Sequence, residues 1–328
     1  MKILHIMGAD LSKDSIDLGL YPGKSYLRID NSINGFHLML NWLKDQGINA
    51  STVMIVMEHT GLYSYHMEAF LHKHQIRFTK VPALQIKRSL GMIRGKTDKI
   101  DAQRIARYGY EKKDSLVALG KPDQTLKRLQ ILHSTRRRLV RYRASLKCAV
   151  KENRVVLKES DIVIQTDLVL IKNFTKQIKT IESEIQKLVT TSKSIRHNCE
   201  LLESVIGVGP VVAVTSIVKT GNFTEFANGR KFACYSGIAP FEHSSGTSIR
   251  KKTRVSHLAD KEMKALLDRA ASSAIQYDKE LKAYYERRLQ MGKSPRSTLN
   301  IVRNKIVHRM FAVIKRGTPF VENYLRAV

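Results

Sequence analysis

One long segment without glycine constrains the fold of this chain more than any other feature. Residues 121–199 contain no glycine, and their only proline, Pro122, lies at the start. Because glycine and proline mark most turns, we expect long helices here. The apolar residues follow the seven-residue or alternating three- and four-residue spacing of a coiled coil: Leu132, Leu139, Leu146, then Ile171, Phe174, Ile178, Ile181, Ile185 and Leu188. This pattern predicts a coiled-coil hairpin that turns near Asp161, with two ordinary core-packing helices as the alternative.

This helical segment divides the chain into three predicted domains, residues 1–118, 119–199 and 200–328. In the first domain, short runs of β-strand composition alternate with helical runs, which is the pattern of an α/β domain. The expected strands are residues 2–7, 16–21 and 51–57, and the expected helices are residues 35–46, 63–74 and 99–110. The third domain is predicted to be mostly α-helical, with a glycine- and serine-containing loop at about residues 237–246.

The charge of the chain predicts a polyanionic partner. There are 57 lysines and arginines against 29 acidic residues, a formal net charge of +28. Such an excess repels itself in a compact fold, and DNA or RNA would neutralise it. Two basic clusters are candidate phosphate contacts, although either could instead be a solvated face: Arg136, Arg137, Arg138, Arg141 and Arg143, and then Arg250, Lys251, Lys252 and Arg254.

Several features predict a cytoplasmic protein without a membrane segment. The apolar N-terminal run is too short for a signal peptide, and the longest apolar run, residues 205–218, is broken by glycine and proline. The three cysteines, Cys148, Cys199 and Cys234, are far apart in sequence, as expected of reduced thiols in a cytosol.

A Gly-x-Gly element lies between two apolar helical runs at the start of the third domain. Gly207 and Gly209 precede Pro210. The arrangement resembles a helix-hairpin-helix unit, in which glycines let backbone N–H groups approach phosphate oxygens beside a helix N-terminus. The same spacing also occurs in plain turns.

Four carboxylates suggest a metal site. Asp10 and Glu58 come at the ends of two apolar strands, and parallel neighbouring strands would bring both acids to one edge of a sheet. Asp98 and Asp101 are three residues apart at the start of a helix and share a face. Taken singly, Asp10 could be a loop residue, and Asp98 could favour a helix N-terminus. Crowded together, the four acids would need a cation, and Mg²⁺ suits both carboxylate ligands and phosphate chemistry.

The motifs at Glu58-His59-Thr60-Gly61, at residues 96–102 and at residues 232–246 together resemble the DEDD transposases of the IS110 insertion-sequence family. These are recombinases guided by a bridge RNA. The resemblance covers nearly the whole chain. It implies a ribonuclease-H-like (RuvC-like) catalytic domain, a coiled coil, and a C-terminal transposase domain with the helix-hairpin-helix-like element.

The family resemblance also implies roles for particular residues. Asp10, Glu58, Asp98 and Asp101 would bind Mg²⁺, and Ser245, which directly precedes Gly246, would be the nucleophile that links covalently to DNA. The sequence departs from the family pattern in two places: Ser244 offers a second serine, and Lys251 stands where a glycine is expected. His243 could serve as a base or be simply solvated.

The same resemblance implies partners for the chain. These are donor and target DNA, a structured guide RNA, and further copies of the chain, because each active site would combine residues from two protomers of a homodimer or homotetramer. The coiled coil is the expected dimerisation element.

Three other functions remain as alternatives from the sequence. The first is a hydrolytic junction resolvase or nuclease of the same fold, with water as the nucleophile; it leaves the third domain unexplained. The second is a basic binding protein without catalytic activity. The third is an actin-like sugar kinase, whose first strand also ends on an aspartate, and the high net charge argues against it.

Overall fold

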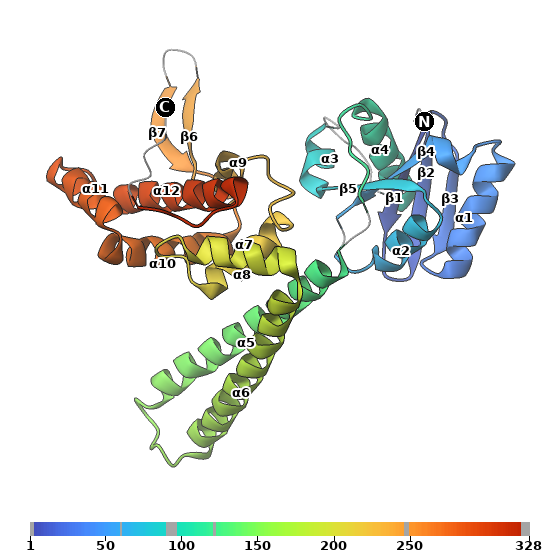
Figure 1. The fold of residues 1–328 in the computed structure, drawn as a ribbon. Coiled ribbons are helices and arrows are strands. Elements are labelled where there is room, and N and C mark those ends of the chain that lie inside the picture. The colour runs from blue at the N-terminus through green and yellow to red at the C-terminus, as the bar shows by residue number, and fades with distance from the viewer. Residues whose placement is uncertain (1–2, 60, 90–96, 121–122, 246–248, 323–328) are drawn as a thin grey trace. The chain divides into compact units, whose positions relative to one another are not determined.

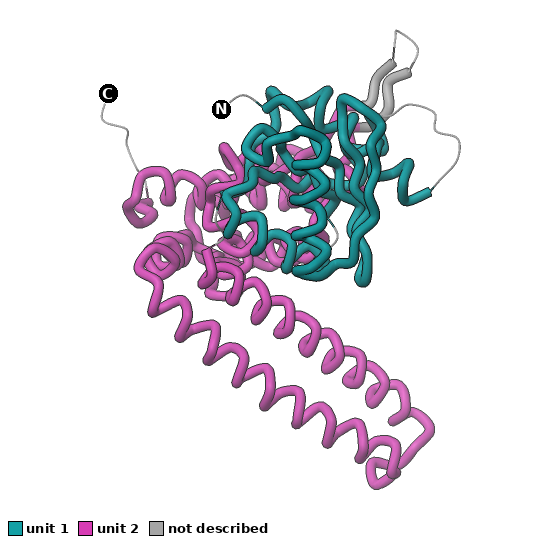
Figure 2. Tube along the Cα trace, turned by 90° about the vertical axis from the view of Figure 1, so that its right-hand side faces the viewer, with its two compact units in different colours: residues 1–122 teal, residues 123–328 magenta. Residues whose placement is uncertain are grey.

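The computed structural model describes residues 3–59, 61–89, 97–120, 123–245 and 249–322, without the side chains of residues 243–252. The chain forms two compact units, Met1–Pro122 and Asp123–Val328, which Figure 2 shows in different colours.

Unit 1 is built on a five-stranded mixed sheet. Its strands are β1 (His5–Leu11), β2 (Ser15–Tyr21), β3 (Tyr26–Asp30), β4 (Val53–Glu58) and β5 (Arg77–Val81). They lie in the order β3-β2-β1-β4-β5, with the first three antiparallel and with β4 and β5 parallel to β1. This order agrees with the predicted ribonuclease-H-like domain. The sequence predicted β1, β2 and β4 but missed β3 and β5, which have only five residues each.

Helices cover both faces of this sheet, as Figure 1 shows. They are α1 (Ile33–Asp45), α2 (Tyr65–Lys73), α3 (Ala83–Ser89) and α4 (Asp98–Glu111), with a short 3₁₀ turn at Ala50–Thr52. Side chains alternate between the faces of a strand, so β4 sends Ile55 toward α1 and α2, and Val56 toward α3 and α4. Both faces of the central strands are therefore buried, which explains their unbroken apolar runs.

Helix α4 lies unusually close to the sheet because glycines face it. A Cβ atom on Gly8 would lie 2.2 Å from the Ala102 carbonyl oxygen, and one on Gly19 would lie 2.9 Å from the Gln103 backbone nitrogen. Gly8 and Gly19 are paired across β1 and β2. This glycine pair fixes the height of α4 above the strands, and so the position of the first turn of α4.

Unit 2 begins with a hairpin of two long helices, α5 (Gln124–Asn153) and α6 (Ile162–Thr191), which run antiparallel side by side (Figures 1 and 2). Asp161 caps α6 by accepting a hydrogen bond from the Val163 backbone N–H, close to the predicted turn. The helices are joined laterally by an ion pair between Arg136 and Glu182 at 2.7 Å. The predicted helical hairpin is confirmed, whereas its role as a coiled coil between protomers stays a prediction.

The remaining helices of unit 2 enclose the larger hydrophobic core. They are α7 (Lys193–Glu203), α8 (Pro210–Thr220), α9 (Gly229–Tyr235), α10 (Lys261–Tyr277), α11 (Lys279–Gln290) and α12 (Pro295–Arg316). Between α9 and α10 the chain forms an antiparallel hairpin of β6 (Pro240–Ser245) and β7 (Ile249–Val255).

This β-hairpin corrects the loop that we expected at residues 237–246. Its pairing shifts by one residue between Phe241 and His243, and a register shift of this kind interrupts the alternation by which strands are recognised. Strand β7 is also rich in charged residues, and such a sequence predicts a loop rather than a strand. Among the residues that the structure describes, no helix has the length and hydropathy needed to cross a membrane.

Candidate active site

Asp10 lies near the end of β1 on the face covered by α4. Gly8 meets α4 on this face, and Asp10, two residues further along the strand, points to the same side. Glu58 is the last residue of β4, the parallel neighbour of β1, and follows Met54 and Val56 on the same face. The predicted meeting of these two acids at one sheet edge is therefore present in the strand register.

The first turn of α4 supplies the other two acids. Thr97 caps the helix by accepting a hydrogen bond from the Ile100 backbone N–H, and Asp98 and Asp101 both lie in the first turn. Because the glycine pair seats α4 against β1 and β2, this turn lies beside Asp10. The capped first turn of α4 and the glycine pair on β1 and β2 thus bring acids from distant parts of the chain to one place.

The electrostatics of Asp10 show that the acids are close enough to interact. Its pKa is raised from 3.8 to about 6, first by burial and then by repulsion from Asp101, Glu58, Asp98 and Asp17. Repulsion of this kind destabilises the charged site unless a cation is nearby. All four predicted acids therefore contribute to a single electrostatic site.

Two arginines supply positive charge to this site. Arg104 lies one turn after Asp101 on α4 and forms an ion pair with it at 2.8 Å. Arg28, on β3, lies 3.8 Å from the exposed carboxylate of Asp98. Sequence reasoning missed both arginines, although the three-residue spacing of Asp101 and Arg104 on a helix is a signal that could have been used.

Asp17 is a fifth acid at the site that sequence reasoning also missed. It lies directly opposite Asp10 in the β1–β2 pairing and is only 3% exposed. The Tyr26 hydroxyl donates a hydrogen bond to Asp17, and this bond is the main reason that the pKa of Tyr26 is raised. Only the register of the hairpin reveals this neighbour, because the sequence does not say which residues of two strands face each other.

The four acids have the oxygen donors that a hard divalent cation prefers, but their side chains are not arranged around a common point. The oxygen donors of Asp10, Glu58, Asp98 and Asp101 are the kind that Mg²⁺ prefers, and their mutual repulsion is what a cation would relieve. Within the described part of the chain, no group of three or more acidic, histidine or cysteine side chains is arranged to hold an ion. One oxygen of Asp101, Oδ1, is engaged by Arg104.

The predicted nucleophile lies on the β-hairpin of unit 2. The backbone of Ser245 ends β6 and pairs with Ile249, while Ser244 pairs with Arg250. The side chains of Ser244, Ser245, Arg250, Lys251 and Lys252 lie outside the described residues, and so do Gly246, Thr247 and Ser248 entirely. Arg254, opposite Phe241 on the hairpin, is exposed.

The arginine cluster of α5 divides into two groups. Arg136 pairs with Glu182, Arg137 pairs with Glu262 of α10 at 3.2 Å, and Arg143 donates a hydrogen bond to Thr175 at 3.3 Å. These three therefore hold the helices of unit 2 together. Arg138 and Arg141 are exposed and remain available for phosphate contacts.

The predicted helix-hairpin-helix glycines also have different surroundings. Gly207 has a φ of +94°, and a Cβ atom there would lie 2.4 Å from the Ala270 carbonyl oxygen. Packing against α10 therefore requires this glycine whether or not it meets a phosphate. Gly209 is the exposed N-cap of α8, and a Cβ atom there would meet nothing within 4 Å, so packing does not require a glycine at this position.

Comparisons with known proteins point to DNA recombination. Residues 7–159 match the family model DEDD_Tnp_IS110, described as a transposase, and residues 199–286 match the transposase IS116/IS110/IS902 family. The pilin gene-inverting proteins of Moraxella bovis and Moraxella lacunata are each 25% identical over 320 residues, 96% of this chain and 97% of the relative. A protein of insertion element IS110 from Streptomyces coelicolor is 26% identical over 167 residues, 51% of this chain and 40% of that protein.

Proposed function

Because this chain belongs to the IS110 family of transposases, we propose that it exchanges DNA strands through a covalent bond between Ser245 and a DNA phosphate. The chain is a DNA transposase or recombinase, as its family members are. Two relatives are named for inverting a pilin gene, and inversion of a DNA segment is one outcome that strand exchange by this chain would produce.

The observation that carries the proposal is the convergence of two acids at the ends of β1 and β4 with two acids in the first turn of α4, where the pKa of Asp10 is raised to about 6. Asp10, Glu58, Asp98 and Asp101 would hold Mg²⁺. When bound, such an ion lowers the pKa of a nearby hydroxyl and stabilises charge on the reacting phosphate. Arg104, which pairs with Asp101, would place a positive charge beside the bound DNA.

The serine step conserves the energy of the phosphodiester bond. The Oγ atom of Ser245 attacks phosphorus and loses its proton, while the bond from phosphorus to the leaving sugar oxygen breaks and that oxygen gains a proton. In the second step a sugar hydroxyl of the new partner strand attacks the phosphoserine and releases Ser245. The bonds formed and broken are of the same kinds, so no nucleotide cofactor is needed.

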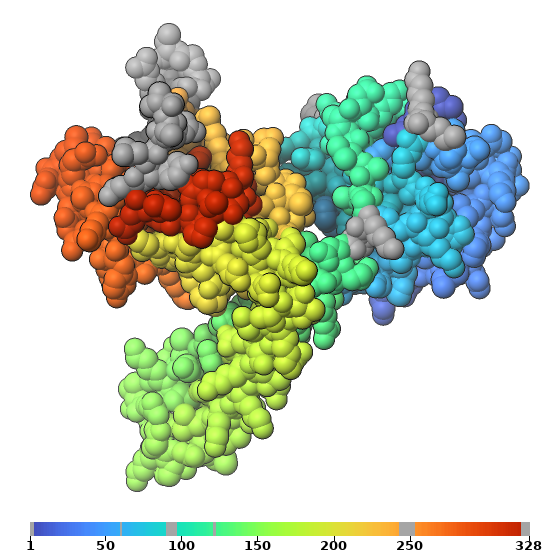
Figure 3. Space-filling model, in the orientation of Figure 1, coloured from blue at the N-terminus to red at the C-terminus, as the bar shows by residue number. Residues whose placement is uncertain are grey.

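A guide RNA and further copies of the chain complete the proposal. The net charge of +28 suits a protein that holds RNA and DNA together, and base pairing would then choose the sequence. The tip of the α5–α6 hairpin exposes Val155, Val156 and Ile162 at 84%, 80% and 76%, an apolar surface that a second protomer would cover. Figure 3 shows this hairpin extending beyond the other helices of unit 2.

Covalent trapping tests the proposed function. We expect the wild-type protein, incubated with end-labelled DNA of the element ends and Mg²⁺, to give a protein–DNA adduct that survives denaturing gel electrophoresis. Ser245→Ala should abolish this adduct and Ser244→Ala should retain it. Asp101→Asn should also abolish it while DNA binding persists.

Two outcomes would contradict the proposal. Loss of the adduct in Ser244→Ala alone would move the nucleophile by one residue. Cleaved strands with free ends and no adduct in the wild type would show a hydrolytic nuclease that uses water. The proposal of a guide RNA is tested separately by sequencing RNA that copurifies with the protein, which should derive from DNA beside its gene.

A further inference from the structure

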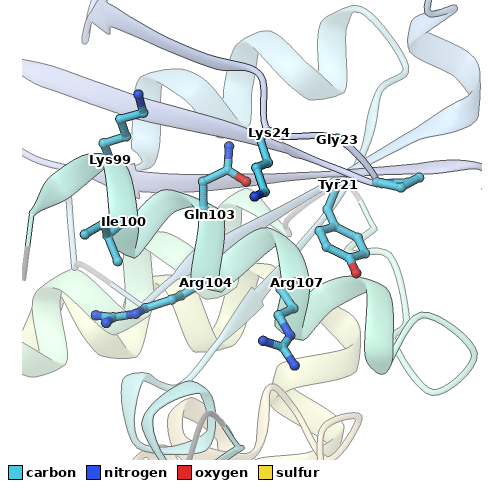
Figure 4. A pocket seen from close by; sticks show the side chains of 9 residues that line it. Tyr21, Gly23, Lys24, Lys99, Ile100, Gln103, Arg104 and Arg107 are labelled. Atoms are coloured by element: carbon cyan, nitrogen blue, oxygen red, sulfur yellow. The ribbon is translucent and has the colours of Figure 1, made fainter. Parts of the chain in front are cut away.

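A shallow cavity of about 690 Å³ lies beside the acids in unit 1. One wall is the turn after β2, residues 21–24, and the other is the face of α4 between Lys99 and Arg107. Figure 4 shows Lys24 reaching from the turn toward Gln103. Among the side chains that line the cavity, Tyr21 lies at one end and Ile100 at the other. Its volume lies within the range of about 300–1,000 Å³ that small organic ligands occupy.

The cavity carries an excess of positive charge. Lys24, Lys99, Arg104 and Arg107 line it. Arg104 pairs with Asp101, and Arg107 pairs with Glu111 at 2.8 Å, while the ammonium group of Lys99 lies over the Tyr26 ring at 5.3 Å. Lys24 is exposed on the turn, and it adds a positive charge to those of the three cations on α4. A ligand with negative charges spaced along it would match this wall.

The cavity also offers apolar surface between its cations. Ile100 is 38% exposed on α4, although it is a large aliphatic residue next to a charged site. Tyr21 is half-buried and is held by its contact with the Tyr110 ring, at a centroid distance of 4.9 Å. A fixed aromatic ring among cations is the usual means of binding unpaired nucleotides, because bases pack on the ring and phosphates pair with the cations.

The cavity and the acids share the first turns of one helix. Lys99 and Ile100 lie between Asp98 and Asp101 in the sequence, and Arg104 contacts Asp101 directly. A strand that occupies the cavity therefore leads to the carboxylates without crossing another element. The bases of an intact duplex are stacked inside the helix and could not reach Tyr21 or Ile100, so a single strand fits this surface better than a duplex.

We infer that this cavity binds the unpaired DNA nucleotides that flank the cleaved phosphodiester. The phosphates lie along Lys24, Lys99 and Arg107, one base packs on the Tyr21 ring, and another packs on Ile100 at the other end of the cavity. The inference rests on the proposed function for the position of the cleaved bond, but the binding itself requires no cleavage. The two can therefore be tested independently.

The test is fluorescence anisotropy of the full-length protein with three labelled probes of the same sequence: a DNA single strand, a DNA duplex and an RNA strand. We expect Lys24→Gln/Arg107→Gln to weaken binding of the DNA strand roughly ten-fold, and to reduce its salt-dependence slope by about 1.4 for two lost phosphate contacts. The matched control is Lys44→Gln/Lys73→Gln. It removes the same charge from exposed positions in α1 and α2, which pack on the other face of the sheet, and should change neither quantity.

A second variant separates base contacts from phosphate contacts. Tyr21→Leu keeps an apolar side chain in the core contact with Tyr110 but removes the stacking ring. We expect it to weaken binding of the DNA strand several-fold with an unchanged salt slope and unchanged duplex binding. Unfolding curves of each variant confirm that the fold is intact.

Three results would overturn the inference. Binding equal to that of the control pair would show that the cavity holds no nucleic acid. Equal loss for the duplex would show a general phosphate surface, and a loss for the RNA strand alone would assign the cavity to RNA. Failure of the proposed function would instead appear as the absence of a protein–DNA adduct in the covalent-trapping experiment. That result would leave the binding measurements unchanged.

Discussion

Asp10 is the residue at which folding and function compete most directly. It lies partly buried among four other acids, and its pKa is raised to about 6. A group whose pKa is raised by folding favours the folded state at low pH and opposes it once the group ionises. The metal-free protein therefore carries a local destabilisation at neutral pH that metal binding would remove.

This leads to a prediction for the metal-free protein. In the presence of a chelator, Asp10→Asn should unfold at the same temperature as the wild type near pH 4. It should unfold at a temperature several degrees higher at pH 8, because a shift of about two pKa units corresponds to about 3 kcal/mol before solvent screening reduces it. Stability that the wild type has below pH 4 is lost as the pH rises through about 6, whereas the amide has no charge to gain. Calorimetry over this pH range is the measurement.

The control for Asp10 is Asp14→Asn, which removes a carboxylate from the exposed turn after β1, and its unfolding temperature in chelator should follow that of the wild type. Saturating Mg²⁺ should raise the unfolding temperature of the wild type at pH 8 and raise that of Asp10→Asn less. If the wild type were more stable than Asp10→Asn in chelator at pH 8, repulsion at Asp10 would not destabilise the metal-free protein.

At the scale of elements, the site depends on how closely α4 lies against the sheet. Gly8 and Gly19 allow the backbone of α4 to approach the strands, and Gly109, near the other end of the helix, meets Ile6 and Val56 in the same way. A helix that lay higher would lift Asp98 and Asp101 away from Asp10. The acids are therefore positioned by residues that carry no functional group.

Gly8→Ala should separate these effects. The added Cβ would lie 2.2 Å from the Ala102 carbonyl oxygen and 2.3 Å from the Ala106 backbone nitrogen, so α4 must move. We expect a loss of stability of about 1–3 kcal/mol in denaturant unfolding and a larger proportional loss of DNA cleavage. Gly120→Ala is the control, since its Cβ would meet nothing within 4 Å. Unchanged cleavage in Gly8→Ala would show that the height of α4 does not matter.

Sequence patterns predicted elements and acids better than they predicted contacts. Asp10, Glu58, Asp98 and Asp101 could be found because two end apolar strands and two share one helix turn. Asp17 and Arg28 could not, because their places depend on the pairing of β1 with β2 and of β2 with β3. The β6–β7 hairpin was missed for the related reason that its shifted register hides the alternation of side chains.

At the scale of the whole molecule, the acids and the serine belong to different compact units. The acids lie in Met1–Pro122 and Ser245 lies in Asp123–Val328. A catalytic site that needs both can draw them from one chain or from two. The exposed apolar tip of the α5–α6 hairpin favours association of chains. In a symmetric dimer, the acids of each chain could then meet the serine of the other chain, which would make two composite sites.

Mixing two inactive variants distinguishes these arrangements. In a heterodimer of Asp101→Asn and Ser245→Ala, composite sites would place both lesions in one site and leave the other intact. We therefore expect about half of the wild-type yield of protein–DNA adduct from heterodimers purified with two different affinity tags. Each variant alone should give none. If every site were built from one chain, each site of the heterodimer would carry a lesion, and no adduct would form. The adduct should also be joined only to the Asp101→Asn chain, which retains its serine, and attachment to the other chain would contradict Ser245 as the nucleophile.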